Sequence, residues 1–144
     1  MKITNVEAIV LRLPEISDAA DGTQDDLLIK VETDEGIIGY GEVDTAPVVG
    51  KAIIDAYMSH GTCYGLKEVV VGADPFDYEQ IWTDMWRKTY YYGRFGPVMH
   101  VMSGIDMALW DIMGKALNMP VHKLLGGSYV TKARAYASAL MPET

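Results

Sequence analysis

Residues 27–43, LLIKVETDEGIIGYGEV, decide how this chain begins to fold. Apolar and polar side chains alternate along residues 27–33, which is the period of a β-strand with one buried face. Residues 37–43 form another β-rich run, and Gly36 can adopt the positive φ that closes a short hairpin between the two. We therefore predict two antiparallel strands joined by a turn at residues 34–36.

A third strand precedes this hairpin. Residues 3–13 alternate in the same way and contain neither Gly nor Pro. If consecutive strands pair, the chain runs up, down and up. Residues 14–26 and 44–46 then lie at one end of the sheet, opposite the tight hairpin. The first of these segments is polar and long for a connection in so small a sheet, which is typical of a functional or mobile loop.

Helices are predicted after Val43, where apolar residues recur at spacings of three and four. We expect Thr45 to cap a first helix that has Pro47 in its opening turn. Residues 61–72 contain several glycines and are predicted to be a connection. We expect Asp74 to cap the next helix, whose apolar stripe is Tyr78, Ile81, Trp82, Met85, Trp86 and Thr89. Such a stripe is typical of core packing.

The longest predicted helix begins near Pro97 and ends at residues 118–120, where Asn and Pro interrupt it. Its predicted buried face consists of Val98, Met102, Ile105, Leu109, Ile112 and Ala116. A short helix over residues 120–125 is expected to stop at Gly126 and Gly127.

Residues 132–140 alternate again, with alanine at every second position, and predict a strand with one face of methyl groups. Such a face suits a crowded place, for example the interior of a closed barrel. Either this strand pairs with the first three, or its neighbours lie outside the 144 residues.

The composition excludes several classes of protein. Apolar residues make up 49% and charged residues 22%, as in a globular protein, and no run approaches the length of a membrane span. The net charge is -8 without a basic patch, so we expect neither nucleic acid nor a membrane as a partner. Cys63 has no cysteine partner in the chain, and the N-terminus does not resemble a signal peptide, which favours a cytoplasmic location.

Several catalytic motifs are absent from the sequence. Gly36, Gly39 and Gly41 fall in the hairpin and its return strand, so they do not form a phosphate-binding loop between a strand and a helix. No Gly-x-Ser-x-Gly motif is present, and Cys63 has only His60 as a nearby base. Nucleophilic catalysis is therefore not predicted.

Polar side chains at the predicted loop end are candidates for substrate binding. They are Asp18, Asp21 and Thr23 in the long loop and Asp44 after the third strand, with Asp25, Asp26 and Glu42 nearby. Together they could surround a cation or a polyhydroxy ligand. The alternative is a solvated acidic rim with no ligand.

The connection between the second and third predicted helices supplies two more candidates, Tyr91 and Arg94. An arginine can hold a substrate carboxylate with two parallel hydrogen bonds. The alternative is that Arg94 is a helix-end cation resting on a neighbouring aromatic ring.

Residues 103–116, SGIDMALWDIMGKA, resemble the mandelate racemase and muconate lactonizing enzyme branch of the enolase superfamily. So do GPV at residues 96–98, PV at residues 120–121, LLGG at residues 124–127, TDEGIIGYGE at residues 33–42 and RAYAS at residues 134–138. The resemblance implies an α+β fold: a three-stranded antiparallel meander followed by helices, which caps a (β/α) barrel. Residues 1–127 would be the capping domain and residues 128–144 the first barrel strand.

The resemblance also implies a function. Members of this branch use a Lys or His base to take the proton next to a carboxylate, and Mg²⁺ stabilises the resulting enediolate. The base and the metal ligands lie on later barrel strands, so no catalytic residue or metal ligand is expected in this chain, and the chain alone is expected to be inactive. Asp111 and Lys115 are expected to form a structural pair four residues apart on a helix.

Two hypotheses follow. In the first, the chain is the N-terminal part of a Mg²⁺-dependent dehydratase, racemase or cycloisomerase that acts on a small carboxylate or acid sugar and forms a homo-oligomer. In the second, it is a stand-alone α+β module for binding or oligomerisation.

Overall fold

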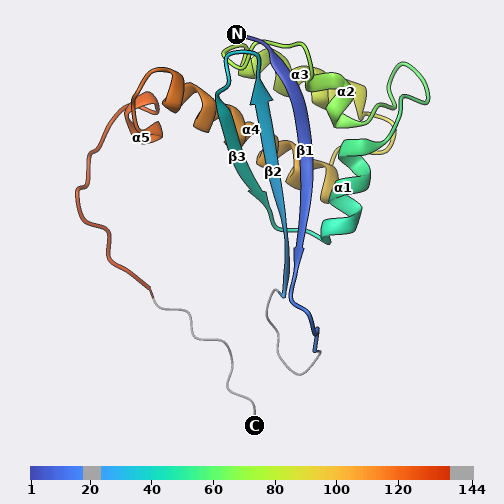
Figure 1. Cartoon of the computed structure of the whole chain (residues 1–144), viewed down its shortest axis with the longest axis horizontal. Coiled ribbons are helices and arrows are strands. Elements are labelled where there is room, and N and C mark those ends of the chain that lie inside the picture. The colour runs from blue at the N-terminus through green and yellow to red at the C-terminus, as the bar shows by residue number, and fades with distance from the viewer. Residues whose placement is uncertain (18–23, 137–144) are drawn as a thin grey trace.

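Three antiparallel strands form the sheet, in the order β1-β2-β3. The computed structural model describes residues 1–17 and 24–136 (Figure 1). The strands are β1 (Ile3–Arg12), β2 (Asp25–Thr33) and β3 (Ile38–Val43). The helices are α1 (Pro47–Asp55), α2 (Leu66–Val70), α3 (Tyr78–Lys88), α4 (Pro97–Ala116) and α5 (Val121–Leu124). This order confirms the α+β fold and the predicted meander.

The register of the sheet places Leu27, Ile29 and Val31 of β2 on one face. Leu27 lies opposite Val10 on β1 and opposite Val43 on β3. Leu27, Ile29 and Val31 are fully buried, whereas Lys30 and Glu32 on the other face are only partly buried. The alternation therefore places one face of the sheet against the helices and leaves the other open.

The predicted hairpin is present between β2 and β3. Gly36 has a φ of 76°, and its amide donates a hydrogen bond to the Thr33 carbonyl at 3.1 Å. A residue with a Cβ rarely adopts this conformation, so glycine allows the tight reversal.

Helix α4 crosses behind the three strands and packs closely on β3 (Figure 1). Glycines on both elements permit this approach: a Cβ on Gly39 would lie 2.1 Å from the Ala108 carbonyl oxygen, and a Cβ on Gly41 would lie 1.9 Å from that of Gly104. Side chains at these positions would push the two backbones apart. The helix is thus fixed against the strand at a short distance.

The core lies between the sheet and the helices. The predicted stripe on α4 is confirmed, since Met102, Ile105, Leu109 and Ile112 are fully buried. On α3, Ile81 and Met85 are buried, and Trp82 and Trp86 pack against the core while partly exposed. The aromatic residues of this stripe are therefore part of the core packing.

Asp111 and Lys115 join α4 to the edge of β3. The Lys115 ammonium lies 2.6 Å from an Asp111 carboxylate oxygen, which confirms the predicted pair. The same carboxylate accepts a hydrogen bond from the Tyr40 amide at 3.0 Å, and Lys115 donates to the Ile38 carbonyl at 2.7 Å. Because β3 is an edge strand, these bonds satisfy backbone groups that the sheet leaves unpaired.

Three local predictions about the helices were wrong. Ala46, not Thr45, is the N-cap of α1, and no side chain caps that helix. Helix α3 begins at Tyr78, because Asp74 accepts a hydrogen bond from the Phe76 amide and forms a turn before the helix. The passage over residues 61–72 contains α2, a helix of only five residues, which is too short to show a helical period.

The chain after α5 has no regular structure in its described part. Gly126 and Gly127 have φ values of 106° and 91° and end the helix as predicted. Residues 132–136, the described part of the predicted final strand, are exposed and pair with no strand, and a strand needs a partner to satisfy its backbone. Residues 137–144 lie outside the described residues. The assignment of residues 128–144 to a barrel strand stays a prediction.

No helix within residues 1–17 and 24–136 is long and apolar enough to cross a membrane.

Candidate functional site

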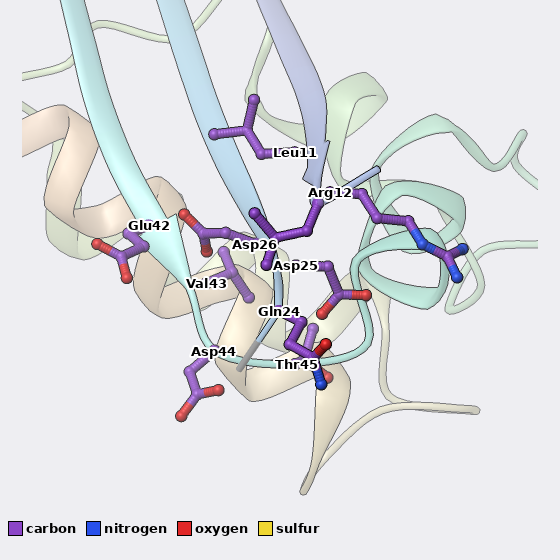
Figure 2. Close-up of a pocket in the computed structure, with 10 residues that line it drawn as sticks. Leu11, Arg12, Gln24, Asp25, Asp26, Glu42, Val43, Asp44 and Thr45 are labelled. Atoms are coloured by element: carbon purple, nitrogen blue, oxygen red, sulfur yellow. The ribbon is translucent and has the colours of Figure 1, made fainter. Parts of the chain in front are cut away.

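A hollow of about 570 Å³ lies at the end of the sheet opposite the β2–β3 hairpin (Figure 2). The end of β1, the start of β2 and the end of β3 form its walls. The lining residues are Leu11, Arg12, Leu13, Gln24, Asp25, Asp26, Glu42, Val43, Asp44 and Thr45. The two connections were predicted to meet at this end from strand direction alone, and the shared hollow confirms that prediction.

The charge of the hollow is mainly negative. Four carboxylates line it, from Asp25, Asp26, Glu42 and Asp44, and Arg12 is the one cation among the lining residues. In Figure 2, Glu42 and Asp44 lie on one side and the Arg12 side chain extends on the other. None of the four carboxylates forms an ion pair with a residue that the structure describes. The hollow therefore offers hydrogen-bond acceptors. These acceptors favour a ligand with hydroxyl groups over an anionic ligand, which the carboxylates would repel.

The described side chains of the hollow do not form a metal site. Across residues 1–17 and 24–136, no group of three or more His, Cys, Asp or Glu side chains is placed to hold a metal ion. Mg²⁺ takes near-octahedral oxygen ligands at short distances, and the carboxylates here do not converge in that way.

The two described ends of the β1–β2 connection are tied together. The Ser17 amide donates to the Gln24 side-chain oxygen at 2.8 Å, and the Gln24 amide group donates back to the Ser17 carbonyl at 2.5 Å. Asp18, Asp21 and Thr23, three of the candidate binding residues, lie outside the described residues. Their roles stay predictions.

Asp44 lies at the border of two hollows. Glu42, Val43 and Asp44 also line a second hollow of about 480 Å³ with His100, Ser103 and Met107 of α4. His100 Nδ1 lies 2.7 Å from the Asp44 carbonyl oxygen. The structure thus extends the candidate site from the sheet onto the first turns of α4.

Tyr91 and Arg94 line neither of these hollows. The Arg94 guanidinium carbon lies 3.9 Å from the centre of the Tyr90 ring, and the Tyr91 ring meets His60 edge-on at 4.9 Å. This geometry supports the alternative reading of Arg94 as a cation on an aromatic neighbour. A role for either residue in substrate binding stays a prediction.

Asp106 has a perturbed pKa but lies elsewhere, in a hollow of about 280 Å³ between α3 and α4. Burial raises the pKa of its carboxyl group, while a hydrogen bond from Trp110 acts in the opposite direction and the charge of Glu79 adds to the rise. Asp106 lines neither hollow at the end of the sheet, so it is not added to the site.

Sequence reasoning missed Arg12, Gln24 and His100. Arg12 ends β1 at the predicted loop end, so strand direction could have identified it. The contact of His100 with Asp44 joins residues 56 positions apart, and no sequence period reports such a contact.

Comparisons with known proteins match the chain to one family. The model described as "Mandelate racemase / muconate lactonizing enzyme, N-terminal domain" matches residues 3–126. A D-galactonate dehydratase of Pectobacterium atrosepticum is 42% identical over 114 residues, which cover 77% of this chain and 27% of that protein. A D-galactonate dehydratase of Klebsiella pneumoniae is 43% identical over 114 residues, with the same coverage.

Two solved structures agree with the fold. The 3,6-anhydro-D-galactonate cycloisomerase of Zobellia galactanivorans superposes with a TM-score of 0.73 at 33% identity, over 88% of this chain and 32% of that one. A member of the enolase superfamily from Salmonella Typhimurium superposes with a TM-score of 0.71 at 35% identity, over 90% of this chain and 30% of that one. The chain therefore spans about a third or less of the length of these relatives.

Proposed function

Since the chain belongs to the mandelate racemase / muconate lactonizing enzyme family, whose N-terminal domain it matches, we propose that it caps the substrate site of a larger enzyme acting on acid sugars. That enzyme removes the proton next to the substrate carboxylate. The identity to two D-galactonate dehydratases favours dehydration of an aldonic acid over racemisation or cycloisomerisation.

The acidic hollow at the end of the sheet is the observation that carries this proposal. Four carboxylates repel the acid end of an aldonate and accept hydrogen bonds from its hydroxyl groups. The capping domain then receives the hydroxylated end of the substrate, and the acid end stays with the part of the enzyme outside this chain. This orientation gives the hollow a role in selecting the substrate without any catalytic residue of its own.

The family implies Mg²⁺, which stabilises the enediolate that forms when the proton leaves. The described residues do not form a site for it. We assign the metal and the acid–base residues to the barrel, so this chain alone is expected to be inactive. The role that we assign to the described residues is to bind and orient the substrate.

The test uses the full-length gene product, a panel of aldonic acids and solvent deuterium. We expect Mg²⁺-dependent conversion of an aldonic acid to a 2-keto-3-deoxy acid that carries one deuterium at carbon 3. The proton leaves carbon 2, hydroxide leaves carbon 3, and the resulting enol takes its new hydrogen from the solvent at carbon 3. Glu42→Gln and Asp44→Asn should each raise KM by roughly fivefold and leave kcat nearly unchanged, because each weakens about one hydrogen bond to the substrate.

Asp55→Asn is the matched control for these variants. Asp55 is also an exposed carboxylate, but it pairs with Lys51 on α1 and lines neither hollow. Its variant should keep the original KM. Absence of a deuterated keto-acid product with every acid sugar would contradict the proposed function, as would Mg²⁺-dependent turnover by the 144-residue chain alone.

A further inference from the structure

The segment between β3 and α1 consists of only residues 44–46 and joins the candidate site to the helices. Its amide and carbonyl groups lie outside the sheet ladder. The Thr45 amide donates to the Val43 carbonyl at 3.1 Å, and the Ala46 carbonyl accepts the first bonds of α1. The Asp44 carbonyl accepts a hydrogen bond from the His100 ring, whose Nδ1 lies 2.7 Å away.

This hydrogen bond determines which nitrogen of His100 carries a proton. A carbonyl oxygen can only accept, so Nδ1 must be the donor. In a neutral ring this places the proton on Nδ1 and leaves Nε2 without one, since the bond made by one nitrogen sets the state of the other. The imidazolium form also donates from Nδ1, so the bond persists when the ring becomes charged.

His100 is well placed to act as a fixed support. It lies in the first turn of α4, where its own amide donates to the Gly96 carbonyl at 3.2 Å. One turn further along, Gly104 contacts β3 so closely that a Cβ there would lie 2.4 Å from Val43 Cγ2. The helix is therefore packed directly on the strand, and the imidazole joins this packed helix to a short connection.

We propose that His100 is a positioning residue that holds the Asp44 backbone in place for substrate binding. This inference rests on the proposed function, in which Asp44 and its neighbours face the hydroxylated end of the substrate. A connection already held in its bound conformation loses less conformational entropy when the ligand binds. The effect should therefore appear in KM and not in kcat.

The first test needs no activity. A two-bond ¹H–¹⁵N correlation spectrum of the 144-residue chain, at a pH where the ring is neutral, should show His100 as the Nδ1–H tautomer. In His100→Leu, the Thr45 amide should exchange with solvent several-fold faster, while the Met102 amide in the buried helix keeps its rate. The Nε2–H tautomer, or an unchanged Thr45 rate, would overturn the proposal.

The second test measures kinetics in the full-length protein. His100→Leu should raise KM about fivefold, as expected for one hydrogen bond, with kcat nearly unchanged. His100→Asn should restore most of the affinity, because its side-chain NH₂ can reach the position of Nδ1. His100→Gln, whose amide reaches the position of Nε2 instead, should not.

His122→Leu is the control. His122 is also an exposed histidine, but it lies on α5 and lines neither hollow, so its variant should keep the original KM. Rescue by His100→Gln and not by His100→Asn would show direct contact with the substrate and overturn the positioning role. If the full-length protein acts on no acid sugar, the proposed function fails, and the tautomer and exchange measurements still decide the role of His100.

Discussion

At the scale of single residues, Arg94 has a backbone conformation that side chains rarely adopt, with a φ of 85°. Only glycine adopts positive φ without a steric cost. Its guanidinium also rests on the Tyr90 ring. The backbone strain at this residue therefore lowers the stability of the fold, whereas the side-chain contact raises it.

Two substitutions at Arg94 separate these effects. Arg94→Ala removes the ring contact and keeps the strain, whereas Arg94→Gly removes both. We expect the glycine variant to be more stable than the alanine variant by about 1 kcal/mol in urea unfolding. Equal stability of the two variants would show that the backbone is not strained.

Tyr92 makes the stability depend on pH. Burial, and less strongly the nearby Cys63 thiol, raise the pKa of its hydroxyl to about 12, and the hydroxyl donates to the Tyr64 carbonyl at 2.5 Å. An unfolded chain releases this proton near pH 10, at the ordinary pKa of about 10. Between the two pKa values only the unfolded state loses the proton, so the contribution to stability is complete below the lower value and is lost as pH rises towards the higher one.

The variant Tyr92→Phe tests this prediction. At neutral pH it should be less stable than the original chain by about 1 kcal/mol, the net value of one hydrogen bond. Urea unfolding above about pH 10 should show this difference shrinking. A difference that stays constant with pH would contradict the raised pKa.

At the scale of elements, the contact between β3 and α4 depends on glycine. Gly41→Ala would place a methyl group 1.9 Å from the Gly104 carbonyl oxygen, and the two backbones would have to separate. We expect a loss of about 2 kcal/mol or more in the free energy of unfolding. Gly61→Ala is the control, because Gly61 has no atom near its Cβ position, and its stability should change little.

The sequence predicted those elements whose signals are local. Helix α4 was predicted to begin near Pro97 and to end at residues 118–120, because an apolar stripe follows Pro97 and Asn and Pro interrupt it. The observed helix is Pro97–Ala116. Helix α2 was missed because five residues contain too little of a helical period. The approach of Gly41 to Gly104 could not be predicted either, since the two residues are far apart in sequence and a glycine alone does not indicate its neighbour.

The candidate site, too, could be predicted only in part from the sequence. Strand directions alone placed Asp44 beside the connection that follows β1. The contact of His100 with Asp44 depends on how α4 crosses the sheet, which is set by packing over the whole core and not by any local pattern.

At the scale of the whole molecule, the isolated chain exposes several large apolar side chains. Tyr57 is 88% exposed and Phe95 is 84% exposed, and their two loops are joined where the Tyr91 amide donates to the Thr62 carbonyl. Exposed apolar surface of this kind favours association. We expect sedimentation of the chain alone to depend on its concentration.

Replacing both Tyr57 and Phe95 with serine should reduce this association. Tyr129→Ser is the control, because Tyr129 is 101% exposed but lies in the segment after α5, away from these loops. Sedimentation that is independent of concentration in the original chain would contradict the prediction and would favour a self-sufficient module.

The meeting of the two connections at one end of the sheet has a consequence for protein engineering. Arg12 and Asp44, which line the hollow at this end, are exposed and are not among the buried side chains of the core. If these residues face the substrate as proposed, a mutant library confined to them can change substrate preference with little loss of thermal tolerance.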